Sequence, residues 1–116
     1  MFLSPGSRST PLAVAFDELA ASARGVALHV VLDERVAAFA ALGASRARRR
    51  PAILVCTSGT AAGHYLPAIM EAAESRVPLI AVTADRPPEL HHCGAPQTIV
   101  QDAMFSRYVR WSATLP

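Results

Sequence analysis

The chain contains no lysine, so its positive charge is carried by arginine alone, with 11 arginines against nine acidic residues and a net charge of +2. Part of this charge is concentrated in the run 46–50. Such a run can bind phosphates or nucleic acid, but it also suits the solvated C-terminus of a helix, where arginine complements the helix dipole. No aromatic residue interleaves the run. We therefore favour the helix end and expect no nucleic-acid partner.

Cysteine is scarce as well. Cys56 and Cys93 are too few for a disulfide framework and lack the C-x-x-C spacing of many metal sites. His91, His92 and Cys93 are consecutive and suggest zinc, but a structural zinc site normally takes four ligands in spaced pairs, and the second pair is missing. We expect Cys56 to lie in the core and the chain to supply no metal ligands.

Long apolar runs are also missing. No stretch approaches the roughly 20 apolar residues that a membrane helix needs. Residues 1–6 show neither the basic region nor the extended apolar region of a signal peptide. The sequence therefore predicts a cytoplasmic protein that does not bind membranes.

The composition that remains is typical of one small domain, 1–116. With 116 residues, of which 52% are hydrophobic and 17% charged, the chain is long enough to bury a single core. This apolar excess suits a sheet that is covered on both faces, or a large buried interface.

Short apolar runs alternate with helical patterns along the chain. The run 52–56 has no polar alternation, which is typical of a central parallel strand. Strands that start near 27, 52 and 78 are separated by about one β-α-β unit, whose crossover is nearly always right-handed. The fold class predicted is therefore α/β, an open parallel sheet with helices on both faces. The expected strands are 2–3, 27–32, 52–56, 78–83 and 109–113, and the expected helices are 10–24, 34–46, 58–75 with a kink or restart at Pro67, and 98–108.

The first expected strand starts at the first residues of the chain, and the last one ends close to its final residue. A domain normally has some margin at its ends. We therefore expect a domain that is truncated at one or both ends.

Polar clusters follow the first four expected strands, at 5–10, 33–35, 57–60 and 85–89. The carboxyl ends of parallel strands meet at one edge of a sheet, where ligands bind. The clusters therefore predict a single site that is built from four loops.

Glu34 is the candidate acid or base of this site. It stands where an apolar strand ends and an alanine-rich helix begins. In a small, mostly apolar pocket its carboxyl would have a raised pKa and could share a proton near neutral pH. The alternative is an ordinary helix N-terminal glutamate that stabilises the dipole, which composition alone favours.

The arginines of the clusters suit an anionic ligand. Ser7 and Arg8 lie in a turn before a helix, where N–H groups and a guanidinium can bind an anion, although a capped helix with a surface arginine explains them equally well. Arg86 lies in a proline-rich loop, and two arginines at one edge suggest a substrate with more than one carboxylate. Gln97 could reach over the edge as a neutral hydrogen-bonding group.

The turn 57–61 contains a glycine, which permits close approach by a ligand ring. It lacks both the G-x-G-x-x-G fingerprint and the P-loop lysine, so nucleotide phosphates are not indicated. Ser58 or Thr60 as a nucleophile would need a base, and His64 lies one helical turn further on. A core or helix-surface role for His64 is the favoured interpretation.

Taken together, these motifs closely resemble one family, in order and spacing. The motifs are Pro-Gly-Ser-Arg-Ser-Thr-Pro at 5–11, Asp-Glu-Arg at 33–35, Cys-Thr-Ser-Gly-Thr-Ala at 56–61 and Thr-Ala-Asp-Arg-Pro-Pro-Glu-Leu at 83–90. The chain resembles, over nearly its whole length, the N-terminal pyrimidine-binding domain of MenD, the thiamine diphosphate-dependent synthases of menaquinone biosynthesis. The first and last motifs are specific to that family within its superfamily.

The resemblance implies a reaction and roles for the site residues. These synthases decarboxylate 2-oxoglutarate on thiamine diphosphate and add the succinyl carbanion equivalent to isochorismate. Glu34 matches the glutamate that hydrogen-bonds N1′ of the cofactor pyrimidine and favours the imino tautomer, whose nitrogen removes the C2 proton. Gly6 and Thr60 match positions that line the pyrimidine, and substrate-binding positions are matched by Ser7, Arg8, Arg86 and Gln97. Where the family usually has a substrate-contacting asparagine, this chain has Pro96.

The resemblance also implies partners that this sequence does not contain. In the family, the diphosphate and Mg²⁺ are held by a C-terminal domain of a second subunit in a homo-oligomer, so the Mg²⁺ ligands are expected there. We expect the isolated chain to be inactive. Two alternatives stay open: another thiamine diphosphate enzyme, such as an acetolactate synthase, and a non-catalytic remnant that acts at most as an interaction module. An acetolactate synthase should show Gly-Pro-Gly at 57–59 and lack the Arg-Pro-Pro loop.

Overall fold

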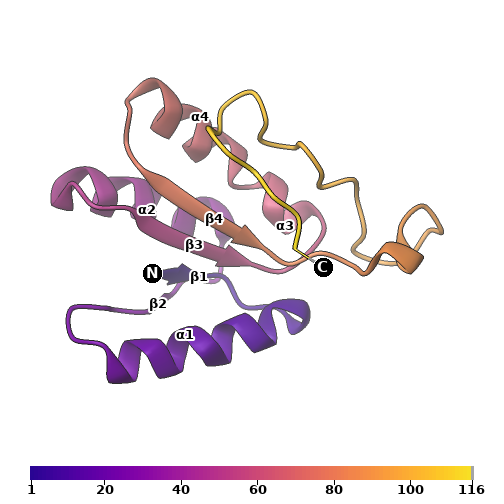
Figure 1. Cartoon of the computed structure of the whole chain (residues 1–116), viewed down its shortest axis with the longest axis horizontal. Helices are drawn as coiled ribbons and strands as arrows, with labels where there is room; N and C mark the ends of the chain where they lie inside the picture. Colours follow the sequence, from indigo (N-terminus) through magenta and orange to yellow (C-terminus); the bar gives the residue numbers. More distant parts are fainter. Residues whose placement is uncertain (116) are drawn as a thin grey trace.

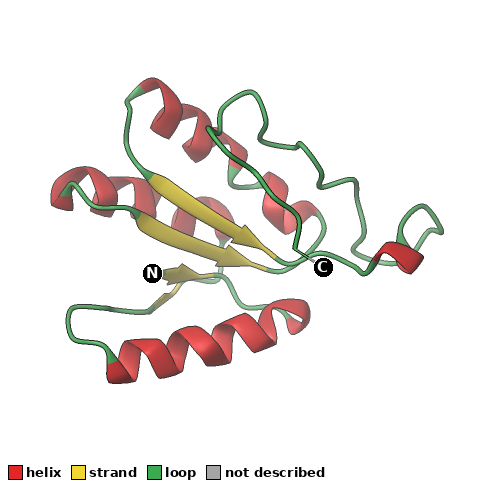
Figure 2. Ribbon diagram, viewed as in Figure 1, coloured by secondary structure: helices red, strands yellow, loops and turns green. Residues whose placement is uncertain are grey.

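A four-stranded parallel sheet forms the centre of the fold, with strand order β2-β1-β3-β4 (Figures 1 and 2). The computed structural model describes residues 1–115. The strands are β1 (Phe2–Leu3), β2 (His29–Val30), β3 (Ala52–Cys56) and β4 (Leu79–Thr83). The predicted α/β class and parallel sheet are confirmed.

β3 is the central strand because it pairs with β1 on one side and with β4 on the other. Leu54, Val55 and Cys56 have no exposed surface, as expected for a strand that is covered on both faces. β2 is shorter than the predicted strand 27–32, because β1 offers only Phe2 and Leu3 as pairing partners.

Helices connect the parallel strands, and such crossovers are nearly always right-handed. Because β1 to β2 steps in one direction along the sheet, and both later connections step in the other, α1 lies on the face opposite α2 and α4. Figure 1 shows α1 apart from α2 and α4, beside β1 and β2. The helical segments are η1 (Ser7–Ser9), α1 (Thr10–Ser22), α2 (Glu34–Arg48), α3 (Thr60–Gly63), α4 (Leu66–Glu74) and η2 (Pro88–Leu90).

The two faces of the sheet are covered unequally. α2 packs against the strands and against α4, and its Ala37, Ala38 and Ala41 are fully buried. These small side chains allow the helix to approach β3 closely, and Tyr65 fills the space beside them. On the opposite face, no residue of α1 is buried. Helices therefore lie on both faces, but the described core lies between the sheet, α2 and α4.

The restart predicted at Pro67 is confirmed, because α3 ends at Gly63 and α4 begins at Leu66, which places Pro67 in its first turn. No helix among residues 1–115 is long and apolar enough to span a bilayer.

The predicted helix 98–108 and strand 109–113 are wrong. The segment instead forms successive turns, in which the Met104 N–H donates to the Gln101 carbonyl at 3.1 Å. Ala103 has a φ of 59°, a left-handed conformation that ends any helix there. The apolar residues that suggested a helix pack on the core from these turns: Met104, Phe105, Tyr108 and Val109.

Candidate cofactor and substrate site

The four polar clusters meet at one edge of the sheet because all four strands are parallel. The described structure brings every sequence-predicted site residue to this edge. After β1 come Gly6, Ser7 and Arg8; after β2 comes Glu34; after β3 comes Thr60; and after β4 come Arg86 and Gln97.

Gly6 is required by close packing between the first and third loops. A Cβ atom on Gly6 would lie 2.4 Å from the Thr57 Cβ, which is closer than real Cβ atoms approach. Thr57 is itself buried, and its Oγ1 has no hydrogen-bond partner in the described structure. The loop that carries Ser7 and Arg8 is therefore seated directly on the end of β3.

Glu34 is the first residue of α2 and is half-buried. The helix is capped by Asp33, whose carboxylate accepts a hydrogen bond from the Arg35 N–H at 2.9 Å. Asp33 also forms an ion pair with the Arg35 guanidinium at 2.6 Å, and this bonding holds the pKa of Asp33 well below its usual range. The Asp33 carboxylate thus bonds to the helix N-terminus and to Arg35. Of these two neighbouring carboxylates, Glu34 is the one that can bind a ligand in the site.

An open hollow of about 400 Å³ lies in front of Glu34. Its lining consists of Leu32, Asp33, Glu34, Arg35 and His64. The sequence favoured a helix-surface role for His64. It is indeed exposed, yet it shares this hollow with Glu34, which sequence reasoning did not foresee.

The end of β3 behind Glu34 is buried and contains two polar side chains. Burial raises the pKa of the Cys56 thiol to about 12, and the charge of Glu34 contributes to that rise. The pKa of Tyr65 is raised by burial and, in smaller part, by Cys56 and Glu34. The Tyr65 hydroxyl lies near Cys56 and Ser4, but neither has hydrogen-bonding geometry, so it has no partner in the described structure. Glu34 therefore lies between an open hollow and a buried, weakly polar strand end.

Both candidate carboxylate-binding arginines contact the segment 96–97. Arg8 donates from Nη1 to the Gln97 Oε1 at 3.0 Å. Arg86 donates to the Pro96 carbonyl from Nε at 3.2 Å and from Nη2 at 2.7 Å. Pro96 lacks an N–H, but its carbonyl oxygen accepts both hydrogen bonds from the Arg86 guanidinium. The two guanidiniums thus bond to the same short segment.

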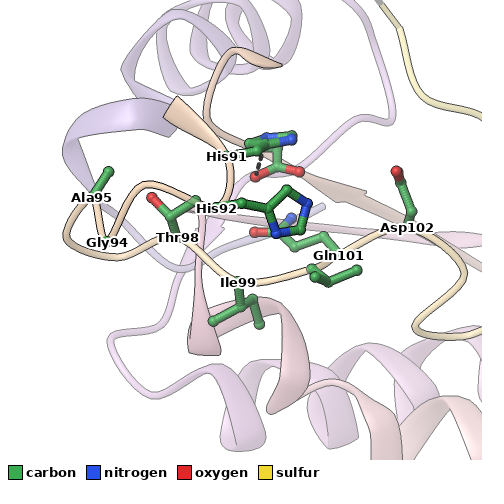
Figure 3. Close-up of a pocket in the computed structure, with 10 residues that line it drawn as sticks. His91, His92, Gly94, Ala95, Thr98, Ile99, Gln101 and Asp102 are labelled. Atoms are coloured by element: carbon green, nitrogen blue, oxygen red, sulfur yellow. Dashed lines mark ion pairs between the residues drawn. The ribbon is translucent and has the colours of Figure 1, made fainter. Parts of the chain in front are cut away.

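A second hollow, of about 230 Å³, lies beside this segment (Figure 3). His91 lies there with its Nε2 at 2.7 Å from the Arg86 carbonyl and 3.8 Å from Asp85. Cys93 is exposed, and its thiol donates to the Leu90 carbonyl at 3.2 Å. Within residues 1–115, no group of three or more His, Cys, Asp and Glu side chains could hold a metal ion.

Sequence reasoning missed Gln101, which lines the second hollow and bonds to two of the site's loops. Its only sequence signal is a second glutamine four residues after Gln97. That spacing would have pointed to one helix face, and the segment is not a helix.

The geometry described so far defines an α/β domain with a ligand site at the carboxyl ends of its parallel strands, where the side chains include the Glu34 carboxylate and the Arg8 and Arg86 guanidiniums. Residues 1–104 match the thiamine pyrophosphate enzyme, N-terminal TPP binding domain family. The chain belongs to this family, and the thiamine diphosphate cofactor expected from the sequence is the family's cofactor.

The relatives are synthases of the kind that the motifs indicated. The chain is 54% identical over 98% of its length to the 2-succinyl-5-enolpyruvyl-6-hydroxy-3-cyclohexene-1-carboxylate synthase of Lysinibacillus sphaericus, and 55% identical over 97% to that of Geobacillus kaustophilus. It spans 19% of the length of each of these relatives. The predicted resemblance to the menaquinone-pathway synthases is confirmed.

Proposed function

We propose that this chain supplies the pyrimidine-binding half of a cytoplasmic, homo-oligomeric synthase of menaquinone biosynthesis. That enzyme would decarboxylate 2-oxoglutarate and add the succinyl unit to isochorismate. The observation that carries the proposal is that Glu34, Arg8 and Arg86 all lie in segments that follow parallel strands, and therefore at one sheet edge, in a chain about 54% identical to such synthases. Because the chain spans about a fifth of those relatives, the diphosphate and Mg²⁺ would be bound by a partner domain.

The residues at the edge fit thiamine diphosphate. Glu34 is half-buried beside an open hollow, and the pair Gly6–Thr57 forms a tightly packed wall that leaves the buried Thr57 Oγ1 without a partner. We propose that Glu34, Gly6 and Thr60 hold the pyrimidine. Bound thiamine diphosphate supplies the carbon nucleophile and electron sink that decarboxylation of a 2-oxoacid requires.

Glu34 is proposed to hold a proton between its carboxyl and the pyrimidine ring nitrogen. The hollow is open, so a ligand ring that covers Glu34 there would remove its carboxyl from water and favour the shared proton. Asp33 cannot take this role while its carboxylate caps α2 and pairs with Arg35. Removing the carboxylate should therefore reduce turnover without altering the cap.

Arg8 and Arg86 are proposed to bind the two carboxylates of isochorismate, with Ser7 and Gln97 as neutral hydrogen-bonding groups. A guanidinium prefers a carboxylate to a neutral carbonyl, because the charged pair is the stronger hydrogen bond. A substrate carboxylate would thus replace the Pro96 carbonyl on Arg86 and the Gln97 amide on Arg8. The segment 96–97 then becomes the element that moves on binding.

The test is a chimera in which this chain replaces the aligned N-terminal segment of the Geobacillus kaustophilus synthase. We expect consumption of isochorismate that depends on 2-oxoglutarate, thiamine diphosphate and Mg²⁺. Glu34→Gln should lower turnover by roughly 10²–10⁴-fold, the usual contribution of a positioned proton-transfer group. Glu18→Gln, on the exposed surface of α1, is the matched control and should have no effect.

Two other results would reject the proposal. A chimera that assembles and binds the cofactor without turnover would favour a non-catalytic remnant. Turnover of pyruvate in place of 2-oxoglutarate would favour an acetolactate synthase-like enzyme. The isolated chain, assayed with the same substrates and cofactors, is expected to be inactive.

A further inference from the structure

We propose that Gln101 is a positioning residue that links the cofactor-side loop to the substrate-side loop. The role rests on the proposed function, although the link itself does not. Gln101 is half-buried and lines the second hollow (Figure 3). Its side-chain amide contacts the loop after β3 and the loop after β4 at once.

Each end of the amide has a partner of the right polarity. The Gly59 N–H donates to Oε1 of Gln101 at 2.7 Å, and Nε2 of Gln101 donates to the Ala84 carbonyl at 3.0 Å. The Gly59 N–H can only donate and the Ala84 carbonyl can only accept, so the Gln101 amide satisfies both groups in one orientation. Both partners are backbone groups, so the link fixes the loops themselves rather than mobile side chains.

The two linked loops carry the two proposed functions. Gly59 is the N-terminal cap of α3, directly before Thr60, and Ala84 lies two residues before Arg86. The Gln101 side chain therefore helps to set the distance between the pyrimidine contact and one carboxylate contact. In the described part of the chain, backbone contact between the two strand ends goes no further than the Ala84 N–H, which donates to the Cys56 carbonyl at 3.0 Å, and the Gln101 amide extends the connection from Ala84 to Gly59.

The segment that carries Gln101 is tied to the same place by a second contact. The Ser58 hydroxyl, fully buried, donates to the Gln97 carbonyl at 3.0 Å. Gln97 has a φ of 59°, and a Cβ on Gly59 would lie 3.0 Å from the Gln97 carbonyl oxygen. Gln97 and Gln101 thus both contact the Ser58–Gly59 turn. Of the two, only Gln101 also bonds to the Ala84 carbonyl.

Amide hydrogen exchange in this chain tests the link directly. Gln101→Leu removes these two hydrogen bonds and the longer one from Nε2 to the Thr83 Oγ1 at 3.5 Å. The buried Gly59 N–H should therefore exchange roughly five- to tenfold faster than in the unsubstituted chain. Gln101→Glu keeps the acceptor for Gly59 but presents a carboxylate to the Ala84 carbonyl. It should preserve Gly59 protection while shifting the NMR signals of residues 84–86. Asp102→Asn is the matched control, since Asp102 bonds only to Thr114 among the described contacts, and it should change neither.

The chimera described above tests whether the link positions the site. Gln101→Leu should raise KM for isochorismate about tenfold with kcat within threefold, the pattern of a lost binding geometry, and Gln101→Glu should act in the same direction. A purely structural defect would instead lower the amount of folded enzyme and leave KM unchanged.

Each result decides the proposal. Equal Gly59 exchange in the leucine, glutamate and unsubstituted chains would overturn the link. A confirmed link with unchanged KM would overturn the positioning role. If the unsubstituted chimera does not turn over, the proposed function fails and the exchange pattern alone decides the link. Should the leucine variant not fold, the glutamate variant still tests the contact, because unshifted signals at 84–86 would exclude it.

Discussion

Around β1 and β3, Gly6 packs against the buried side chain of Thr57, whereas around β4 the exposed segment 96–97 is held by hydrogen bonds to Arg8 and Arg86. The first region, which adjoins Glu34 on α2, is positioned by the close contact of Gly6 with Thr57, and we name it the packed half. The second, with Arg86, Gln97 and Gln101, is positioned by polar contacts, and we name it the bonded half. A packed region resists displacement because cores are nearly incompressible, while exposed hydrogen bonds exchange readily with water or a ligand.

This difference suits the two ligands proposed. A cofactor that stays bound needs a fixed wall, and a substrate that enters and leaves needs groups that can change partners. Small steric changes should therefore disturb the packed half most, and changes of polar side chains should disturb the bonded half without unfolding the domain.

The largest contrast should appear in thiol reactivity. Cys56, in the packed half, is fully buried with its pKa raised to about 12, and Cys93, beside the bonded half, is exposed. At pH 8 a thiol reagent should label Cys93 at least about a hundredfold faster than Cys56, because the Cys56 thiol is accessible only when the fold opens locally. Mass spectrometry of Cys56→Ala and Cys93→Ala variants would separate the two rates. Similar rates would mean that the packed half opens easily.

Gly6→Ala should be the most damaging single substitution in the packed half. The added Cβ meets Thr57 at 2.4 Å, so one of the two segments must shift, at a cost of about 1–3 kcal/mol in the free energy of unfolding. Gly43→Ala is the matched control, because Gly43 lies within α2 and its added Cβ meets nothing within 4 Å. It should stabilise the protein by about 0.5–1 kcal/mol, since alanine favours a helix. Urea unfolding of both variants measures the difference, and equal midpoints would refute the close contact.

Tyr65→Phe should act in the opposite direction. The buried Tyr65 hydroxyl has no partner, so its removal should stabilise the protein by about 1 kcal/mol at neutral pH. The folded-state pKa of Tyr65 is raised above the ordinary 10.0, so above that pH the tyrosine ionises more readily in the unfolded chain, and the free energy of unfolding of the unsubstituted protein falls. The advantage of the phenylalanine variant should therefore grow above pH 10. Thermal unfolding between pH 7 and pH 11 measures it, and a constant or falling advantage would contradict the unpartnered hydroxyl.

Sequence patterns predicted the packed half well and the bonded half poorly. β3 was predicted residue for residue, and the position of Glu34 at the start of a helix followed from the change of periodicity after residue 32. Such segments are determined by local pattern and burial together. The segment 98–113 has the apolar content of a helix and a strand, but its residues are held by turns and contacts with distant elements. Gln101 was missed for the same reason, since its partners are 42 and 17 residues away.

Arg86→Ala should have the smallest effect on stability and the most local one. Arg86 is half-buried, and its two hydrogen bonds to the Pro96 carbonyl are exposed, so their loss should change the free energy of unfolding by no more than about 1 kcal/mol. Arg24→Ala, at an exposed turn after α1, controls for the loss of one positive charge. The change should instead appear in the NMR signals of residues 95–98, which lose their anchor, while those of Gly6 and Thr57 stay in place. A loss of stability as large as that of Gly6→Ala, or shifts that spread to Gly6, would mean that the two halves of the site are one mechanical unit and not two.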